Sequence, residues 1–137
     1  FVRDTQVSVF DLPTGKLRAV LNHEQEIRGI RASPERNILA TLAGGAVYVW
    51  NYSTGQLLSQ LTDAGYVRDI RFSVDGRYLF TGSHDHTAVL WLWKTEDLRD
   101  EACKRLSYNL TAAEWSRYVG NTSYRKTCPN LAADTKN

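Results

Sequence analysis

The sequence predicts an all-β fold, a partial β-propeller made of two near-complete four-stranded blades plus a strand pair, with a short helical C-terminal extension. Three observations support this. The chain resembles itself at an offset of about 40 residues, apolar and polar residues alternate within each repeat, and turn-forming residues separate the alternating runs. Short antiparallel strands, four to a repeat of this length, are typical of propeller blades.

The self-similarity extends over many positions at one offset. After one inserted residue the alignment also brings Trp50 onto Trp91. The other matched pairs are Phe10 with Trp50, Leu17 with Leu57, Leu21 with Leu61, Ile27 with Val67, Ile30 with Ile70, Ser33 with Ser73, Leu39 with Leu79 and Thr41 with Thr81. So many agreements at one spacing indicate a structural repeat rather than a chance of composition.

The alternating runs predict nine strands, each bounded by residues that favour turns. Gly can supply a positive φ in these turns, and Asp can bond to its own backbone. The expected strands are Val7–Phe10, Lys16–Leu21, Ile27–Ala32, Asn37–Leu42, Ala46–Trp50, Gln56–Leu61, Val67–Phe72, Arg77–Gly82 and Ala88–Trp93.

Composition and charge exclude several classes of protein. The chain is 42% hydrophobic and carries a net charge of +2, which fits a packed domain and gives no basic surface for nucleic acid. No run is long and apolar enough to span a membrane. We expect a cytoplasmic protein that binds neither nucleic acid nor membrane. Methionine is absent and Phe1 comes first, so we expect a piece of a longer or processed protein.

The stretch from Val67 to Trp91 closely resembles a WD40 repeat. It has the hydrophobic strand, the Phe-Ser-x-Asp-Gly turn, the Gly-Ser-x-Asp-x-Thr turn and the terminal Trp of that family. The segment His23–Asn51 resembles a second, weaker copy. The resemblance covers residues 1–94 and implies that these form the partial WD40 propeller.

The resemblance also implies a hydrogen-bonded web inside each blade, built from a His, a hydroxyl, an Asp and the Trp of the third strand. In the first blade, His23, Thr41 and Trp50 match, but the turn at residues 43–45 supplies no Asp. These webs are structural, so an incomplete web predicts a less rigid blade and a polar group that needs another partner.

In the second blade the carry-over is incomplete in a different way. Asp85 and Trp91 match, either Thr81 or Ser83 can supply the hydroxyl, and Asp63 stands where the His would be.

In WD40 proteins the top face of the propeller is the usual surface for partners. The positions that point there correspond to Glu26, Tyr66 and His84, which are our candidate contact residues. The competing interpretation is that they are ordinary solvated turn residues.

No catalytic, metal or cofactor site is expected. The run His84-Asp85-His86 could offer metal ligands, but alternate residues of a tight turn diverge, and no further ligand is evident. Nucleophile and phosphate-binding motifs are absent from the sequence, and the glycines at 44 and 45 fit a hairpin turn better than a phosphate cradle. We therefore expect a protein that is not an enzyme, although an effector enzyme could reside in an associated chain.

Two interpretations of the cysteines stay open. Cys103 and Cys128 lie 25 positions apart without a zinc-binding pattern. The leading interpretation is two buried free thiols in a reducing compartment. The alternative is a single disulfide that pins the C-terminal segment, which would be consistent with a secreted protein.

After Trp93 the period changes, and residues 95–131 are expected to form a helical and irregular extension packed on the propeller, followed by a flexible tail at 132–137. Leu98, Ala102, Cys103 and Leu106 mark one face of a short helix. A second helix should begin at Thr111, with Glu114 completing a capping box, and should end near Gly120.

The extension resembles the C-terminal tail of large bacterial, especially cyanobacterial, WD40 proteins. The matching runs are Glu101–Leu106 and Tyr124–Leu131, with Trp115 between them. In such proteins the propeller often follows a STAND-type NTPase, a protease or a kinase, and acts as a sensor or scaffold.

Two roles follow from these resemblances. We expect a protein-interaction or sensor module from a larger signalling or defence-type protein. Its partners would be proteins, including the remaining blades of the propeller in another chain or in an upstream segment. The alternative is a purely structural piece that closes a ring while its partner chain performs recognition or catalysis.

Overall fold

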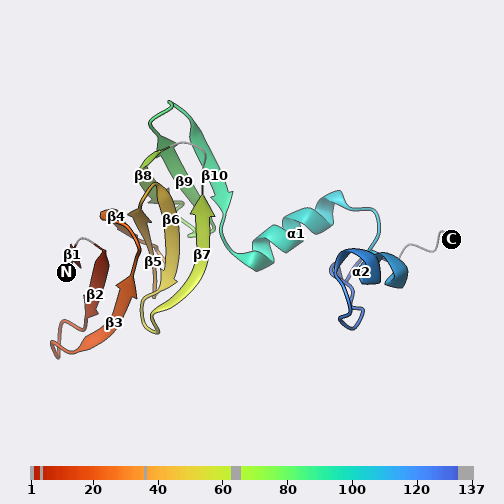
Figure 1. Cartoon of the computed structure of the whole chain (residues 1–137), viewed down its shortest axis with the longest axis horizontal. Coiled ribbons are helices and arrows are strands. Elements are labelled where there is room, and N and C mark those ends of the chain that lie inside the picture. The colour runs from red at the N-terminus through yellow and green to blue at the C-terminus, as the bar shows by residue number, and fades with distance from the viewer. Residues whose placement is uncertain (1, 4, 36, 63–65, 133–137) are drawn as a thin grey trace. The chain divides into compact units, whose positions relative to one another are not determined.

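The computed structural model describes residues 2–3, 5–35, 37–62 and 66–132, and it divides the chain into two compact units (Figure 1). Unit 1 spans Phe1–Lys94 and unit 2 spans Thr95–Asn137. Each unit has its own secondary structure and its own buried residues, so each is described by itself. No described helix is both long enough and apolar enough to cross a membrane.

Unit 1 consists of three antiparallel sheets that follow one another along the chain (Figure 1). The first sheet contains β1 (Val2–Arg3), β2 (Gln6–Phe10) and β3 (Leu17–Asn22). The second contains β4 (Ile27–Ala32), β5 (Ile38–Ala43), β6 (Ala46–Asn51) and β7 (Gln56–Thr62). The third contains β8 (Val67–Phe72), β9 (Tyr78–Ser83) and β10 (Ala88–Leu92).

These strands confirm the sequence-based prediction of antiparallel blades. No end of an expected strand differs from the observed end by more than one residue. The second sheet is a complete four-stranded meander in the order β4-β5-β6-β7. The third repeats its first three strands in the order β8-β9-β10. The two-residue strand β1 was not anticipated, because two residues are too few to show an alternating pattern.

The second sheet is buried on both faces, and this burial forms the core of unit 1. All six residues of β5 are buried. On one face Ile38, Ala40 and Leu42 join a cluster that includes Ile70 and Leu79 of the third sheet. Each large apolar side chain that is fully buried in this way stabilises the fold by about 1.5–3 kcal/mol.

On its other face the second sheet packs against the first sheet. Leu39 and Trp50 share a cluster with Val7, Ala19 and Leu21. Neighbouring residues of β5 therefore contribute to different cores, as the alternation of side chains along a strand requires. The two clusters fix the order in which the three sheets stack.

The turn between β8 and β9 shows why Gly is needed at one of the predicted turn positions. Gly76 has a φ of +68°, a conformation that favours glycine. A Cβ added there would lie 2.8 Å from Cγ of Glu35. The carbonyl oxygen of Gly76 accepts a hydrogen bond of 3.0 Å from Nε1 of Trp93, which is buried. The Val-Asp-Gly turn thus anchors the end of unit 1.

Unit 2 contains two helices. Helix α1 spans Thr95–Arg105 and has no buried residue, whereas α2 spans Ala112–Tyr118 and buries Trp115. The capping box expected at the start of α2 is confirmed, since the side chains of Thr111 and Glu114 each bond to the other's backbone amide. Gly120 follows the C-cap with a φ of +96°, so the helix ends where expected.

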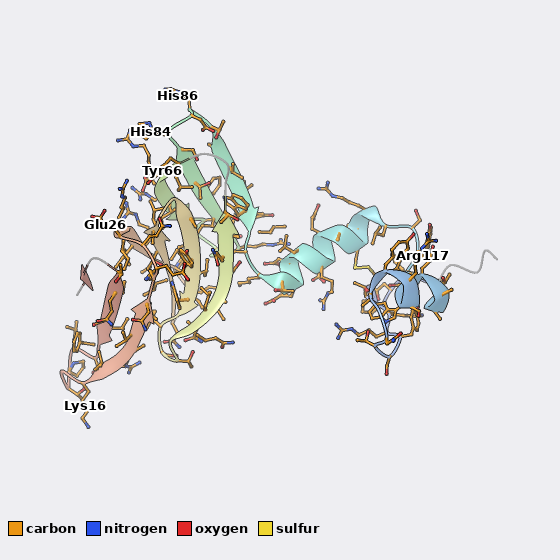
Figure 2. The ribbon with its side chains drawn as sticks, viewed as in Figure 1. Lys16, Glu26, Tyr66, His84, His86 and Arg117 are labelled. Atoms are coloured by element: carbon orange, nitrogen blue, oxygen red, sulfur yellow. A yellow bond between two sulfur atoms is a disulfide. The ribbon has the colours of Figure 1, made fainter. Side chains whose placement is uncertain are left out.

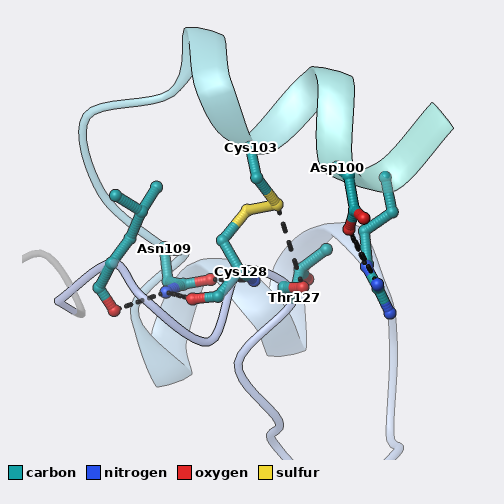
Figure 3. Close-up of a disulfide and its surroundings, with 7 residues drawn as sticks. Asp100, Cys103, Asn109, Thr127 and Cys128 are labelled. Atoms are coloured by element: carbon teal, nitrogen blue, oxygen red, sulfur yellow. Dashed lines mark hydrogen bonds and ion pairs between the residues drawn. A yellow bond between two sulfur atoms is a disulfide. The ribbon is translucent and has the colours of Figure 1, made fainter. Parts of the chain in front are cut away.

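Cys103 and Cys128 form a disulfide, so the leading interpretation of two free thiols is wrong (Figure 3). Asn109 accounts for the position of Cys128. Its amide nitrogen donates to the carbonyl oxygens of Cys128 and Leu131, and its amide oxygen accepts from the Cys128 backbone, each at 2.8 Å. These bonds hold Cys128 beneath Cys103 of α1, an approach that spacing alone does not reveal.

Unit 2 should depend on this disulfide for its folded state. Its buried residues are Asn109, Trp115 and Cys128, which make a small core, and small cores usually need a covalent link. We expect the double variant C103S/C128S to destabilise unit 2 by about 3 kcal/mol, the contribution of closing a loop of this length. In nuclear magnetic resonance spectra the indole N–H signal of Trp115 should lose its native shift.

The tryptophans of unit 1 provide the internal control for this experiment. The indole signals of Trp50 and Trp91 should stay at their native positions in the same spectra. A native Trp115 signal in the double variant would contradict the proposed dependence.

Candidate functional site

A buried polar web lies inside the second sheet. Thr41, on β5, is fully buried, and its Oγ1 accepts a hydrogen bond of 2.9 Å from Nε1 of Trp50. Nε2 of His23 lies 2.7 Å from the same oxygen. The Thr41 hydroxyl has one proton and two lone pairs, so its role toward Nε2, as donor or as second acceptor, depends on the tautomer of His23. The structure thus brings together the three web residues expected in the first blade.

Nδ1 of His23 is buried and has no hydrogen-bond partner of normal geometry among the described residues. The turn at residues 43–45 supplies no Asp as a partner for this nitrogen, as the sequence indicated. Burial lowers the pKa of His23, and the nearby backbone groups of Thr5 and Leu21 offset part of that lowering. Burial therefore favours the neutral form of His23.

The third sheet contains a smaller version of the web. Nε1 of Trp91 donates to Oγ1 of Thr81 at 2.9 Å, and Thr81 is buried. Asp63, at the position of the missing His, lies outside the described residues. Oδ1 of Asp85 accepts from the backbone and the hydroxyl of Thr87, at 3.0 and 2.6 Å. These bonds within the turn lower the pKa of the Asp85 carboxyl. The Ser83 amide donates to the Thr87 carbonyl at 3.0 Å across the same turn.

The three candidate contact residues lie at one end of the sheets, the end opposite to Lys16 (Figure 2). Glu26 directly precedes β4, Tyr66 directly precedes β8, and His84 directly follows β9. The backbone N–H of His84 donates to the Tyr66 carbonyl at 2.9 Å, so these two residues are held together. The Tyr66 side chain is 51% exposed and is available for contact with a partner.

Arg28 connects the candidate residues. Its guanidinium carbon lies 5.5 Å from the centre of the Tyr66 ring, a distance that permits a cation–π interaction. Its Nη2 lies 3.7 Å from Oε2 of Glu26. Arg68, on β8 of the third sheet, lines the same hollow as Arg28, Tyr66 and His84. We call Glu26, Arg28, Tyr66, Arg68 and His84 the rim.

The hollow at the rim is shallow, with a volume of about 230 Å³. Its lining residues are Arg28, Leu42, Tyr66, Val67, Arg68 and His84. Sequence reasoning identified Tyr66 and His84 but missed both arginines. The signal was present, since the motif of an Arg at the second and fifth positions occurs in both Ile27–Arg31 and Val67–Arg71.

His86 belongs to the same turn as His84, and Figure 2 shows both at this end of unit 1. His86 has a φ of +66°, which is uncommon for a residue other than glycine. Within the described parts of the chain, no group of three or more His, Cys, Asp or Glu side chains is arranged to hold a metal ion. The rim therefore presents an aromatic ring, an imidazole and two guanidiniums as contact groups.

Residues 55–91 match the family model of the WD domain, G-beta repeat. The chain is 27% identical over 93 residues to the nuclear distribution protein nudF of Aspergillus niger, covering 64% of this chain and 21% of that protein. It is 25% identical over 99 residues to the small ribosomal subunit protein RACK1 of Drosophila melanogaster, covering 65% and 31%. The chain thus spans less than a third of the length of either relative.

Solved structures show the same fold. A chain in a structure of ctPRC2 superposes with a TM-score of 0.58 at 23% identity, covering 66% of this chain and 21% of that one. The computationally designed Ika4 protein superposes with a TM-score of 0.57 at 27% identity, covering 66% and 56%. With the strand order described above, these matches show that unit 1 has the fold of a partial β-propeller.

The two webs predict unequal costs of losing their hydroxyl. We expect Thr41→Val to lower the free energy of unfolding by about 2–3 kcal/mol, because it leaves both Trp50 Nε1 and His23 Nε2 without their partner. The matched variant Thr81→Val removes a single contact, to Trp91, and should cost about 1 kcal/mol. Urea unfolding measures both values. Equal losses in the two variants would show that His23 contributes nothing to the web.

Proposed function

We propose that this chain is a non-enzymatic protein-interaction module that binds a partner through the rim. The observation that carries the proposal is the half-exposed Tyr66 ring, which is held by Arg28 on one side and tied to His84 through its backbone. Aromatic side chains in fixed positions contribute strongly to protein interfaces because they bury a large area with little loss of entropy.

The geometry of the rim suits a peptide or loop rather than an enclosed small molecule. The hollow is smaller than most ligand pockets, which measure roughly 300–1,000 Å³. It opens beside strand ends and loops, and such loops can vary in sequence without disturbing the sheets. A protruding side chain of a protein partner fits such a surface.

The wider setting of the module stays a prediction. A sensor role in a larger signalling or defence-type protein, and a bacterial origin, rest on the resemblance of residues 95–131 to the tails of bacterial WD40 proteins. The two relatives described above come from a fungus and an insect. An attached STAND-type NTPase, protease or kinase domain is proposed on the same resemblance.

Selection of peptides tests the rim directly. A phage-displayed library of random peptides is panned on the purified chain, and the selected peptides are then measured against Tyr66→Ala/His84→Ala. We expect binding to weaken about tenfold or more, because the variant removes the central aromatic contact and its neighbour.

The matched control is Tyr118→Ala, which removes an exposed tyrosine from unit 2 and should leave binding unchanged. If no peptide is selected, or if the selected peptides bind the double variant as tightly as the unaltered chain, the proposed function is wrong.

A second candidate function is structural, and the outer face of the third sheet favours it. Phe80 and Leu90 are paired across β9 and β10 and are 47% and 52% exposed. Their counterparts in the preceding repeat, Ala40 and Val49, are paired in the same way and lie fully buried beneath the third sheet. The repeat thus indicates that this outer face fits another blade of the same kind.

Sedimentation of the purified chain tests the structural candidate. Exposed apolar faces of this kind drive association, so the unaltered chain should self-associate with rising concentration, with a second copy covering the face. Phe80→Glu/Leu90→Glu should abolish this association, whereas Leu12→Glu, at a 94% exposed position elsewhere, should not. A chain that stays monomeric at every concentration would argue against a role in closing a ring.

A further inference from the structure

We propose that the hollow at the rim is a carboxylate site that recognises an acidic segment of a partner protein, with Arg28 and Arg68 as the two cations that bind it. This inference rests on the proposed function and names the chemistry of the ligand. Neither arginine is among the contact residues that the sequence indicated.

Arg28 and Arg68 occupy equivalent, irregular positions in their strands. In the pairing of β4 with β5, Ile27 lies opposite Ala43 and Gly29 opposite Leu42, so Arg28 is an extra residue. The pairing of β8 with β9 skips Arg68 in the same way, between Val67 and Asp69. Such bulges redirect a side chain and occur often beside functional sites. Both redirected arginines line the hollow.

The lower arginines, Arg31 and Arg71, lie further along the same two strands and share one carboxylate. Arg31 and Arg71 both donate to Oδ1 of Asp69, at 2.9 and 2.8 Å. The contact of Arg31 joins β4 to β8, whereas that of Arg71 lies within β8, and neither guanidinium is left without a carboxylate. The Asp69 carboxylate therefore binds Arg31 and Arg71.

The upper arginines, Arg28 and Arg68, are less closely paired. Arg28 has Glu26 as its carboxylate, but at 3.7 Å, which is too long for a hydrogen bond. Arg68 is exposed and makes no ion pair with any described residue. Arg28, Arg68 and His84 thus line the hollow, no acidic residue is among its described lining residues, and Glu26 lies beside Arg28. A carboxylate entering from solvent would meet an excess of positive charge.

The chemistry of the lining favours a carboxylate on a protein over other anions. Guanidiniums bind carboxylates through two parallel hydrogen bonds, and the half-exposed ring of Tyr66 offers apolar contact to the chain that carries the acid. Nucleic acid would need a row of cations spaced along its phosphates. The chain as a whole has a net charge of +2, and the two lower arginines are already paired.

The effect of Glu26 on binding distinguishes an acidic ligand from a ligand of another kind that binds at the rim. If the ligand is acidic, the Glu26 carboxylate repels it and competes with it for Arg28. Removing that charge should then strengthen binding, whereas removing a favourable contact residue would weaken it. Glu26→Gln keeps the size of the side chain and changes only its charge.

The probe is a fluorescein-labelled peptide of alternating Glu and Gly, and its binding to the full chain is followed by fluorescence anisotropy. We expect Arg28→Gln/Arg68→Gln to weaken binding about tenfold, since two charged contacts are lost. Glu26→Gln should tighten binding by about twofold or more. Added salt should weaken binding of the unaltered chain, and a matched Gln–Gly peptide should bind far more weakly.

The control variant is Lys16→Gln/Arg117→Gln, which lowers the net charge equally. Lys16 lies at the opposite end of unit 1 and Arg117 belongs to unit 2 (Figure 2). It should retain the affinity of the unaltered chain. All of the altered side chains except Glu26 and Arg28 are free of ion pairs in the described structure, and circular dichroism checks that every variant stays folded.

Several outcomes would overturn the proposal. The first two are an equal loss of affinity for the probe in the rim and control variants, and a lower affinity in Glu26→Gln. The other two are equal affinity of the unaltered chain for the Gln–Gly peptide and the probe, and displacement of the probe by an oligonucleotide more readily than by unlabelled acidic peptide. If library selection yields neutral peptides that need Tyr66 and His84, the proposed function stands and the acidic ligand is wrong. If the selection yields no peptide, both the proposed function and the acidic ligand are wrong.

Discussion

Burial of the second sheet on both of its faces is the constraint on which the rest of unit 1 depends. Every residue of β5 is buried, and successive residues serve two different clusters. The first and third sheets are each held by one face to this sheet. The stacking also sets β4 beside β8, where Asp69 accepts from Arg31 across the gap. Packing at the centre thereby decides which strand ends and loops meet at the rim.

The polar features of unit 1 divide into a buried set and an exposed set. Thr41, with Trp50 and His23, is buried within the blade and can contribute only to its rigidity and specificity. The rim lies at the strand ends, where bulges interrupt the pairing and two arginines enter the hollow. The blades thus provide a rigid support, and their irregular positions provide the chemistry.

Much of unit 1 could be predicted from sequence because strands leave a local signal. The repeat that links Trp50 with Trp91, together with the turn residues between the apolar runs, predicted the strands and their order, and the missing Asp predicted a polar group in the first blade that needs another partner. The arginines at the rim depend on a shift in register, and the Cys103–Cys128 bond depends on an approach across 25 positions. The arginines recur at the spacing of the repeat, but nothing in the sequence signals the shift in register or the approach of the two cysteines. The cytoplasmic location and the packing of residues 95–131 on the propeller stay predictions, and disulfides persist mainly in oxidising compartments.

Hydrogen exchange of the backbone amides tests most directly whether the doubly buried sheet holds unit 1 together. If it does, the amides of β5 and β6 should be the slowest to exchange and should open only when the whole unit unfolds, whereas those of β10, which has one paired edge among the described strands, should exchange through local opening. Protection of β9 and β10 equal to or greater than that of β5 and β6 would contradict the account.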